Sequence, residues 1–194
     1  MARPRKFEME QAIENAMQAF WDHGYEATSM ADLMKAMDLQ KGSIYKAFGD
    51  KHTLFIAALE HYLDDYSQTT IKLIESEDSP KKGIYVWLQT VLADAYKQKL
   101  RRGCMVVNTL NERAHFDKDA AIVIEASLSK LSVFIAKKIE EAQELGEIRN
   151  DLNPTDIAQL ILVSLTGTWT LSKGPMTKAV GIQYIKNIFK LIEA

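Results

Sequence analysis

The sequence predicts an all-α fold. Across its 194 residues, apolar side chains recur at spacings of three and four almost everywhere, and no segment of real length alternates apolar and polar residues. Spacings of three and four are the period of an amphipathic helix, whereas alternation would mark a half-buried strand. A content of 47% hydrophobic and 26% charged residues is typical of a folded domain, and the chain is long enough to bury a substantial core.

The composition argues against several other classes of protein. Disorder requires low hydrophobicity with a high net charge, but the net charge here is only -2. No run approaches the roughly 18 apolar residues of a membrane span, and no apolar stretch follows the basic N-terminus as in a secretory signal. The single cysteine, Cys104, permits no intrachain disulfide. We therefore expect a cytoplasmic protein with no membrane partner.

Three helices are predicted in the first fifty or so residues. The first spans about Phe7–His23 and ends at Gly24, the place of a C-terminal glycine cap. Thr28 and Ser29 offer an N-cap for a short second helix. Asp38 makes a turn, and a short third helix covers Lys41–Phe48 with its apolar residues on one side. This succession predicts an N-terminal three-helix domain over residues 1–52.

Six further helices are predicted in residues 53–194, which we expect to form a second, C-terminal helical domain. A break in the pattern around Pro80 ends the first of them. The first of them follows Asp50 as its N-cap. The other five cover about Ile84 to Tyr96, Gly103 to Ala114, Lys118 to Leu145, Pro154 to Leu171 and Thr177 to Ile192.

The second and third helices have the lengths and separation of a helix-turn-helix, which presents one helix to the major groove of DNA. Spacing alone is weak support, because many helical proteins contain two short adjacent helices. The third helix adds stronger support, since it carries four hydrogen-bond donors: Lys41, Ser43, Tyr45 and Lys46. Gly42 leaves room for a close approach of the backbone to the duplex. The pattern predicts DNA binding by this helix.

Further cations flank the motif. Arg3, Arg5 and Lys6 precede the first helix as a mobile basic arm, and Lys51 stands where the next helix begins and could hold a phosphate. Residues 1–52 nevertheless contain seven Lys and Arg against eight Asp and Glu, a net charge of -1. We therefore expect the cations to face the duplex and the acids to face away from it.

The stretch TSMADLMKAMDLQKGSIYKAFGDKHTLF, residues 28–55, together with the preceding FWDHGYEATS, resembles the tetracycline-repressor (TetR) family of bacterial transcriptional regulators. The resemblance is close over about residues 8–60 and architectural beyond. It implies that Tyr45 and Lys51 contact phosphates and that residues 40–43 lie nearest the bases. Asp38 stands where the family usually has glycine. The full set of expected DNA-contacting residues is Arg3, Arg5, Lys6, Thr28, Ser29, Gln40, Lys41, Gly42, Ser43, Tyr45, Lys46 and Lys51.

The C-terminal helices carry bulky rings, thioethers and polar tips within apolar faces, which is the composition of small-molecule pockets. The family resemblance also implies an effector bound there, an apolar or aromatic molecule. Ordinary core packing is the alternative role for each residue taken singly. The candidate lining is Trp87, Tyr96, Cys104, Met105, Asn108, Phe134, Ser164, Thr168 and Trp169.

Cys104 has two competing interpretations. It stands at a helix start beside Arg101 and Arg102, where dipole and charge would stabilise a thiolate and make the protein a thiol-based redox or electrophile sensor. The alternative is a buried, inert thiol that packs as a small hydrophobe.

The eighth and ninth helices are apolar over more than one stripe, so they offer more apolar surface than one neighbour covers. Two copies packed as a four-helix bundle would cover it, and the family resemblance implies a homodimer of this kind. The small residues Ser164 and Gly167 would permit close approach. A dimer would place its two third helices on a pseudo-palindromic DNA site.

The sequence shows no constellation for catalysis and no cofactor signature. There is no metal-ligand spacing such as H-E-x-x-H, no G-x-S-x-G, no Walker loop and no dinucleotide fingerprint. We therefore predict no enzyme, no metal and no cofactor. The prediction is a ligand-responsive repressor that a small apolar or aromatic molecule releases from double-stranded operator DNA. The alternatives are a helical small-molecule-binding module that does not bind DNA, and the thiol-based sensor.

Overall fold

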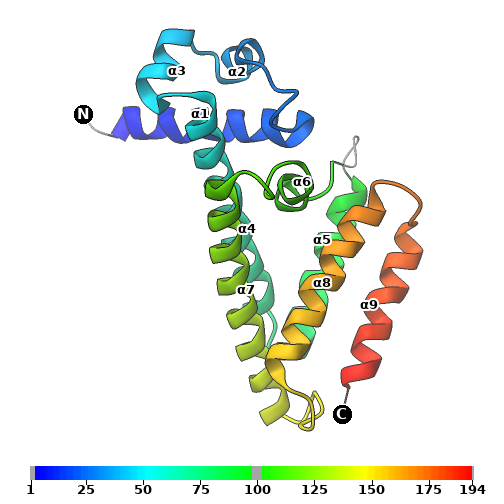
Figure 1. The fold of residues 1–194 in the computed structure, drawn as a ribbon. Coiled ribbons are helices and arrows are strands. Elements are labelled where there is room, and N and C mark those ends of the chain that lie inside the picture. The colour runs from blue at the N-terminus through cyan, green and yellow to red at the C-terminus, as the bar shows by residue number, and fades with distance from the viewer. Residues whose placement is uncertain (1–2, 98–101, 194) are drawn as a thin grey trace. The chain divides into compact units, whose positions relative to one another are not determined.

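The structure is a computed structural model that describes residues 3–97 and 102–193, and these residues form nine helices (Figure 1). Pairing of β type within the described residues is limited to an isolated antiparallel bridge between Ile148 and Glu193. The all-α prediction is confirmed. The helices are α1 (Arg3–His23), α2 (Met30–Met37), α3 (Lys41–Phe48), α4 (Lys51–Glu75), α5 (Pro80–Lys97), α6 (Met105–Glu112), α7 (Lys118–Glu144), α8 (Pro154–Ser172) and α9 (Lys178–Ile192).

Helix α1 begins earlier than predicted. The backbone of Arg3, Arg5 and Lys6 belongs to its first turns, so the expectation of a separate basic arm at these positions is wrong. The side chains of these three residues lie outside what the structure describes. None of the described helices has both the length and the apolar content needed to cross a bilayer.

The chain divides into two units. Unit 1 comprises Met1–Asp65 and Cys104–Glu125, and unit 2 comprises Tyr66–Gly103 and Ala126–Ala194. Helices α4 and α7 each contribute one part to unit 1 and the other to unit 2. Unit 1 therefore includes α6, which the sequence placed with the C-terminal helices.

Unit 1 is built around the packing of α1 against α2, with α3 resting on α2. Its core contains Phe20, Leu33, Ile44 and Phe55, each at most 2% exposed. Burying a side chain of this size stabilises the fold by about 1.5–3 kcal/mol. Ile44 is the buried residue of α3, and its burial decides which face of that helix points outward.

Unit 2 has a continuous apolar core in which α5 packs against α8 and α9 (Figure 1). Trp87 and Ile84 of α5 are fully buried at its centre. Two glycines allow the close approaches: a Cβ on Gly83 would lie 2.2 Å from the carbonyl oxygen of Ile74, and one on Gly181 would lie 2.8 Å from Leu92. At Gly83 the backbones of α5 and α4 therefore come into direct contact, whereas at Gly181 the side chain of Leu92 packs against the backbone of α9.

Candidate nucleic-acid interface

Helix α2 is held by reciprocal caps at its start and by a left-handed residue at its end. The hydroxyl of Ser29 accepts from the backbone N–H of Asp32 at 3.2 Å, and the Asp32 carboxylate accepts from the N–H of Ser29 at 2.8 Å. The hydroxyl and the backbone N–H of Ser29 both donate to the Asp32 carboxylate, and these two hydrogen bonds hold the pKa of Asp32 below its usual value. Asp38 adopts φ 53° and ψ 41° and donates its N–H to the carbonyl of Met34. Aspartate thus supplies the turn conformation that glycine usually provides.

Helix α3 presents its polar side to solvent. Ile44 is 1% exposed and Phe48 is half-buried, whereas the other side chains of the helix lie on the surface. Tyr45 is 41% exposed, and the ammonium of Lys41 lies 5.7 Å from the centre of its ring. The surface residues are Lys41, Gly42, Ser43, Tyr45, Lys46 and Ala47. The outward face thus carries the donors that the sequence predicted. A Cβ added to Gly42 would have no other atom of the described structure within 4 Å.

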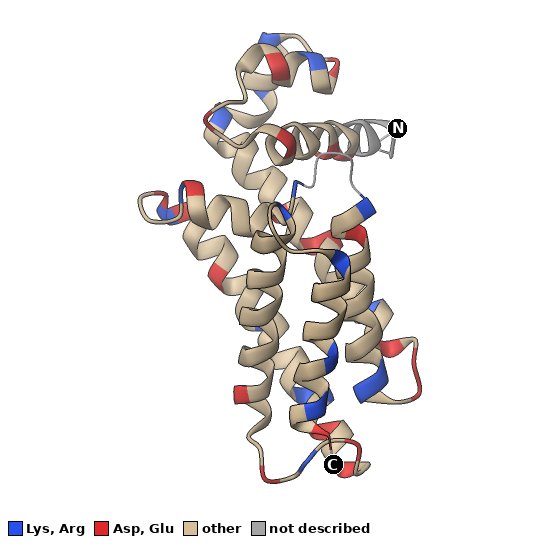
Figure 2. Ribbon diagram, turned by 90° about the vertical axis from the view of Figure 1, so that its right-hand side faces the viewer, with Lys and Arg blue, Asp and Glu red and all other residues tan. Residues whose placement is uncertain are grey.

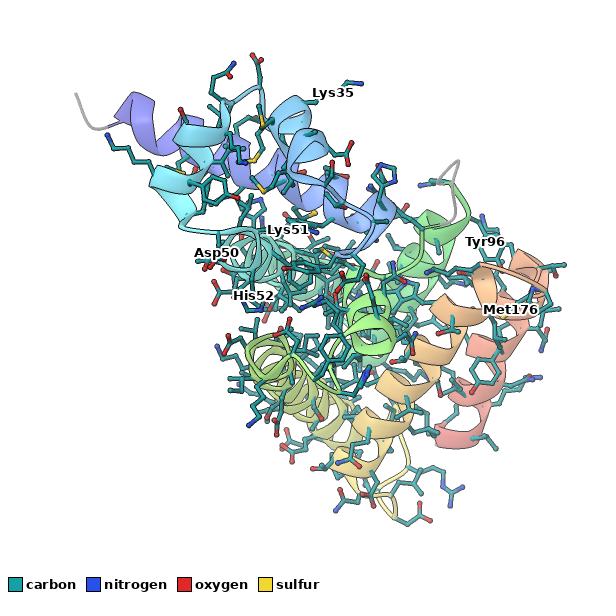
Figure 3. The ribbon with its side chains drawn as sticks, turned by 45° about the horizontal axis from the view of Figure 1, so that its top comes forward. Lys35, Asp50, Lys51, His52, Tyr96 and Met176 are labelled. Carbon is teal, nitrogen blue, oxygen red and sulfur yellow. The ribbon has the colours of Figure 1, made fainter. Side chains whose placement is uncertain are left out.

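The start of α4 adds a fixed cation next to α3. The carboxylate of Asp50 accepts from the N–H of Thr53 at 2.7 Å, which lowers the pKa of Asp50 and caps the helix. The ammonium of Lys51 lies 4.2 Å from the centre of the Tyr25 ring, an attraction between a cation and the ring face. Figure 3 shows Asp50, Lys51 and His52 in succession at this helix start.

Two of the expected DNA-contacting residues have structural roles. Thr28 is fully buried and its hydroxyl donates to the carbonyl of Gly24 at 2.6 Å, which occupies its side chain within the fold, and a contact of Thr28 with DNA stays a prediction. Ser29 is exposed, but its hydroxyl donates to the Asp32 carboxylate at 2.6 Å as part of the cap. Gln40 is exposed and its side chain makes no cap hydrogen bond to α3.

The loop after α1 is held by Glu112, from the end of α6. Its two carboxylate oxygens accept from the backbone N–H of Tyr25 at 3.1 Å and of Glu26 at 2.9 Å. Gly24 adopts φ +81°, and a Cβ at this position would lie 2.9 Å from the Glu112 carboxylate. Glycine is therefore required here both by the backbone conformation and by the close contact.

An ion-pair network centred on the buried side chains of Arg113 and Asp117 continues from this loop. The guanidinium of Arg113 pairs with Asp117 at 2.9 Å and with Glu26, and it lies 3.7 Å from the centre of the Tyr25 ring. Asp117 also accepts from the backbone N–H of Ala120 and lies 3.1 Å from Nε2 of His52. We name these side chains the Arg113 network, comprising Glu26, His52, Arg113 and Asp117.

The network changes the titration of two groups. Burial acts to raise the pKa of Asp117, but the hydrogen bonds from His52, Ala120 and Arg113 together outweigh burial and lower it. Burial raises the pKa of Tyr25, opposed by the nearby positive charge of Arg113. Both effects keep the groups in their ordinary charge states at neutral pH. This network was not predicted from the sequence, although Arg113 and Asp117 are only four residues apart, in the turn between α6 and α7.

Three potential metal ligands come together at the same place. One ligand atom each from His52, Asp117 and Asp119 lies within 4.8 Å of the others. Both oxygens of Asp117, however, already lie within hydrogen-bond distance of His52. One of them also accepts a hydrogen bond from Arg113, and the other accepts one from the backbone N–H of Ala120. The Arg113 network therefore accounts for this group of residues, and we assign no metal to it.

The charges around the motif are local and mixed. Figure 2 shows Lys and Arg interleaved with Asp and Glu along the helices of this region instead of a uniformly basic face. The exposed cations of α3 are Lys41 and Lys46, and Lys35 of α2 is exposed as well. An attraction for phosphates would therefore come from a few placed cations and act at short range.

Comparison with known proteins gives the same motif a family. Residues 12–58 match the profile described as "Bacterial regulatory proteins, tetR family", and residues 84–176 match "Tetracyclin repressor-like, C-terminal domain". The chain belongs to the tetR family. It is a helix-turn-helix transcriptional regulator, and the resemblance drawn from residues 28–55 is confirmed.

Individual tetR-family proteins are similar over most of the chain. The HTH-type transcriptional repressor ComR of Escherichia coli K12 is 26% identical, over 85% of this chain and 79% of that protein. The HTH-type transcriptional repressor DhaR of Mycobacterium sp. strain GP1 is 23% identical, over 93% of this chain and 89% of that protein. A cysteine-substituted variant of CifR, solved with a 26-base-pair operator duplex, has a TM-score of 0.80 at 23% identity and covers 94% of this chain and 95% of that one.

The residues predicted to line an effector site fall into both units of this tetR-family chain. Cys104, Met105 and Asn108 belong to unit 1, and Trp87, Tyr96, Phe134, Ser164, Thr168 and Trp169 belong to unit 2.

Several of the predicted residues in unit 2 are already bonded. The hydroxyl of Tyr96 donates to the carbonyl of Met176 at 2.5 Å, and Figure 3 shows the two residues together. The hydroxyl of Thr168 donates to the carbonyl of Ser164 at 2.8 Å, and that of Tyr184 donates to the Ser164 hydroxyl at 3.2 Å. These hydrogen bonds give Tyr96, Ser164 and Thr168 a structural role within unit 2.

Cys104 is 4% exposed and stands at the N-cap of α6. The hydroxyl of Tyr62 donates to its sulfur at 3.4 Å. Of Arg101 and Arg102, which were expected to stabilise the thiolate, Arg101 lies outside the described residues. Burial and a hydrogen-bonded sulfur are what the inert interpretation predicts, and the thiol-sensor hypothesis stays a prediction.

Proposed function

We propose that this chain is a homodimeric repressor that binds a pseudo-palindromic operator through α3 and is released by a small, mainly apolar effector held in unit 2. The observation that carries the proposal is the outward face of α3. Its donors are exposed while Ile44 fixes the helix from below. An eight-residue helix with exposed donors on a capped scaffold fits the recognition helix of a helix-turn-helix.

The contacts divide by chemistry. Tyr45 and Lys51 are assigned to phosphates, because a phenol and an ammonium serve as point donors to phosphate oxygens. Gln40, Lys41 and Ser43, at the start of α3, are assigned to base edges in the major groove. The division into a DNA-binding domain of residues 1–52 and an effector and dimer domain of residues 53–194 is part of the same proposal.

The homodimer is supported by apolar side chains exposed on α8 and α9. Val163 is 71% exposed, Leu191 is 67% and Val180 is 56%. Gly167 is exposed and meets nothing within 4 Å of an added Cβ, which leaves room for a second copy to approach closely. Ser164, predicted to serve the same purpose, is buried and hydrogen-bonded inside unit 2. The proposed dimer face is therefore the outward stripe of Leu160, Val163, Gly167, Leu171, Val180, Tyr184 and Leu191.

Effector and operator are proposed to oppose each other. The effector binds a state in which the two recognition helices are wrongly spaced for successive major grooves, so it shifts the population away from the DNA-binding state. By thermodynamic linkage the operator must weaken effector binding by the same factor. Helix α4, which begins at Lys51 in unit 1 and ends at Glu75 in unit 2, is the proposed lever.

The proposal involves no enzymatic turnover, since binding and release of DNA need only equilibrium affinities. It places the protein in the cytoplasm, the compartment of bacterial DNA. A helical small-molecule-binding module that does not bind DNA is the alternative that the experiment must exclude.

The test is operator binding by a double variant, Tyr45→Ala with Lys51→Ala. An operator is first selected from a random pool of duplexes, and affinity is measured by fluorescence anisotropy. Removing two charge-assisted or phosphate-directed hydrogen bonds from each protomer should weaken binding on the order of a hundredfold or more. The control is Lys130→Ala, which removes an exposed lysine of α7 in unit 2.

Wild-type binding should also fall steeply with salt. A dimer that contacts about six to ten phosphates loses roughly a thousandfold in affinity or more between about 50 and 200 mM salt. Selection that yields no preferred duplex, or full binding by the double variant, would support the module that does not bind DNA.

A further inference from the structure

Thr70 and Trp87 are buried polar residues of unit 2 whose side-chain polar atoms have no hydrogen-bond partner among the described residues. Trp87 is 0% exposed and Thr70 is 1% exposed. Within the described residues, neither the indole Nε1 of Trp87 nor the hydroxyl of Thr70 has a hydrogen-bond partner. A buried polar group left unsatisfied costs about 1–3 kcal/mol, so each such group in a native protein requires an explanation.

The two groups lie at the same level of one helix pair. Helices α4 and α5 touch where Gly83 meets the carbonyl of Ile74, since a Cβ on Gly83 would lie 2.2 Å from that oxygen. Moving four residues from each contact residue, away from the connecting turn, leads to Thr70 on α4 and to Trp87 on α5. Four residues are about one helical turn, so the same rise separates both groups from the contact. The antiparallel pair therefore brings the hydroxyl and the indole to one level.

The surroundings of this level are apolar and aromatic. Trp87 belongs to the buried cluster that includes Ile135, Ile161 and Leu165, and Tyr66 packs against the same cluster. The ring of Tyr66 meets that of Trp169 edge to face at 5.7 Å between centroids. Among the described residues of unit 2, the buried polar ones are Thr70, Ser164, Thr168 and Ser172, and none of them carries a charge that would neutralise a buried ionic ligand.

We infer that Thr70 and Trp87 recognise the hydrogen-bond acceptor of a neutral, mainly aromatic effector, such as the oxygen of a ketone or amide. Indole N–H is only a donor, and a threonine hydroxyl can donate as well. A carbonyl oxygen has two lone pairs and can accept from both groups. A hydrocarbon would leave both donors unpaired, and a carboxylate would be buried without a counter-charge. The inference rests on the proposed function for the claim that unit 2 holds an effector.

The experiment uses three probes of similar size: acetophenone as the neutral acceptor, ethylbenzene as the hydrocarbon and benzoate as the anion. The chain has three tryptophans, so a spectrum of the full-length protein labelled with 15N at the indole nitrogen contains three side-chain signals. Acetophenone should shift the Trp87 indole proton downfield and leave that of Trp21, in unit 1, in place. It should bind about three- to tenfold more tightly than ethylbenzene, the value of one net hydrogen bond. Benzoate should bind more weakly than both.

Two variants show which donors carry the preference. Trp87→Phe keeps a ring but removes the N–H, and Thr70→Val keeps the shape but removes the hydroxyl. Each should reduce the preference for acetophenone over ethylbenzene, while the matched control Trp21→Phe should keep it. Thr70→Val serves as the independent test if Trp87→Phe does not fold.

Several results would overturn the inference. They are equal affinities for acetophenone and ethylbenzene, a preference that survives both variants, stronger binding of benzoate, or no binding of acetophenone. If acetophenone does not change the chemical shift of the Trp87 indole proton, the two donors bind a buried water and no effector. Operator affinity of the same preparation separates the two proposals: a protein that binds the operator but fails these tests refutes this inference alone, and one that passes them without binding any operator refutes the proposed repressor.

Discussion

Two pairs of buried residues, one pair in each unit, differ in whether the protein supplies hydrogen-bond partners for their polar atoms. In unit 1, the side chains of Arg113 and Asp117 are 9% and 4% exposed, and they are bonded to each other and to further groups around them. In unit 2, Thr70 and Trp87 are buried more deeply still, but their polar atoms have no partner within the described part of the chain. The cost of desolvation is thus offset by protein partners at Arg113 and Asp117 and left open at Thr70 and Trp87.

This difference separates positioning from recognition. A fully paired network has one favourable arrangement, so the Arg113 network fixes the loop after α1 and the start of α4, next to Lys51. Unpaired donors gain free energy only when a ligand supplies the acceptor, so they are suited to an effector. Unit 1 is therefore expected to lose stability when a polar partner is removed, whereas unit 2 is expected to respond mainly to changes in packing.

The largest effect is expected for Arg113→Ala. The change leaves Asp117 buried with only part of its hydrogen bonds and removes the cation from the Tyr25 ring. Breaking a buried ion pair in this way typically lowers the free energy of unfolding by about 3–5 kcal/mol. Urea unfolding followed by circular dichroism measures the loss.

The control is Arg149→Ala, which breaks an Arg–Asp pair whose side chains are 45% and 64% exposed. An exposed pair is screened by water, so no measurable change is expected. Equal losses for the two variants would show that the Arg113 network does not stabilise unit 1 through burial.

A smaller loss is expected in unit 2 for Gly83→Ala. The added Cβ would lie 2.2 Å from the carbonyl oxygen of Ile74, which is backbone, so α4 and α5 must move apart. Overpacking of this kind costs about 1–3 kcal/mol. Gly181→Ala is the matched control, because its Cβ meets the flexible tip of Leu92 at 2.8 Å and should cost less. Thermal unfolding of the two variants would contradict the expectation if Gly181→Ala were the less stable one.

Acid should weaken unit 1 through Asp117. Its pKa lies below the ordinary value of 3.8, so its stabilising contribution is complete above that value and is lost as the pH falls through the lower, folded-state pKa. In Asp117→Asn this contribution is absent at every pH. The difference in unfolding free energy between wild type and variant should therefore shrink between about pH 5 and pH 2. A difference that stays constant over this range would mean that the Asp117 charge does not stabilise the fold.

Local patterns predicted most of the fold. The range of α3, Lys41–Phe48, follows from its apolar period, and the cap at the start of α2 follows from the hydroxyl residues that precede that helix. The start of α1 was placed too late, because the basic residues before Phe7 carry no apolar period that would mark them as helical. A helix without an apolar face leaves no such signal in the sequence.

The candidate sites were predicted less completely because they depend on contacts between distant residues. Donors on α3 could be identified from one short segment. The structural role of Thr28 could not be identified in this way, since its burial depends on how α1 ends. The bonds between Glu112 and residues 25–26 join positions 87 and 86 residues apart, and no spacing rule points to them. Thr70 was missed because a buried threonine without a partner looks like any other threonine in sequence.

The smallest effect on stability, with the opposite sign, is expected for Gly42→Ala. Nothing lies within 4 Å of the added Cβ, and Gly42 has helical neighbours on both sides. Alanine should therefore raise the free energy of unfolding by about 0.5–1 kcal/mol, because it loses less backbone entropy on folding than glycine. Under the proposed function the same methyl group faces the duplex and should weaken operator binding. More stability with less DNA binding, measured by thermal unfolding and fluorescence anisotropy, would separate the role of α3 in recognition from its role in the fold. Unchanged operator affinity would mean that the backbone at Gly42 does not closely approach DNA.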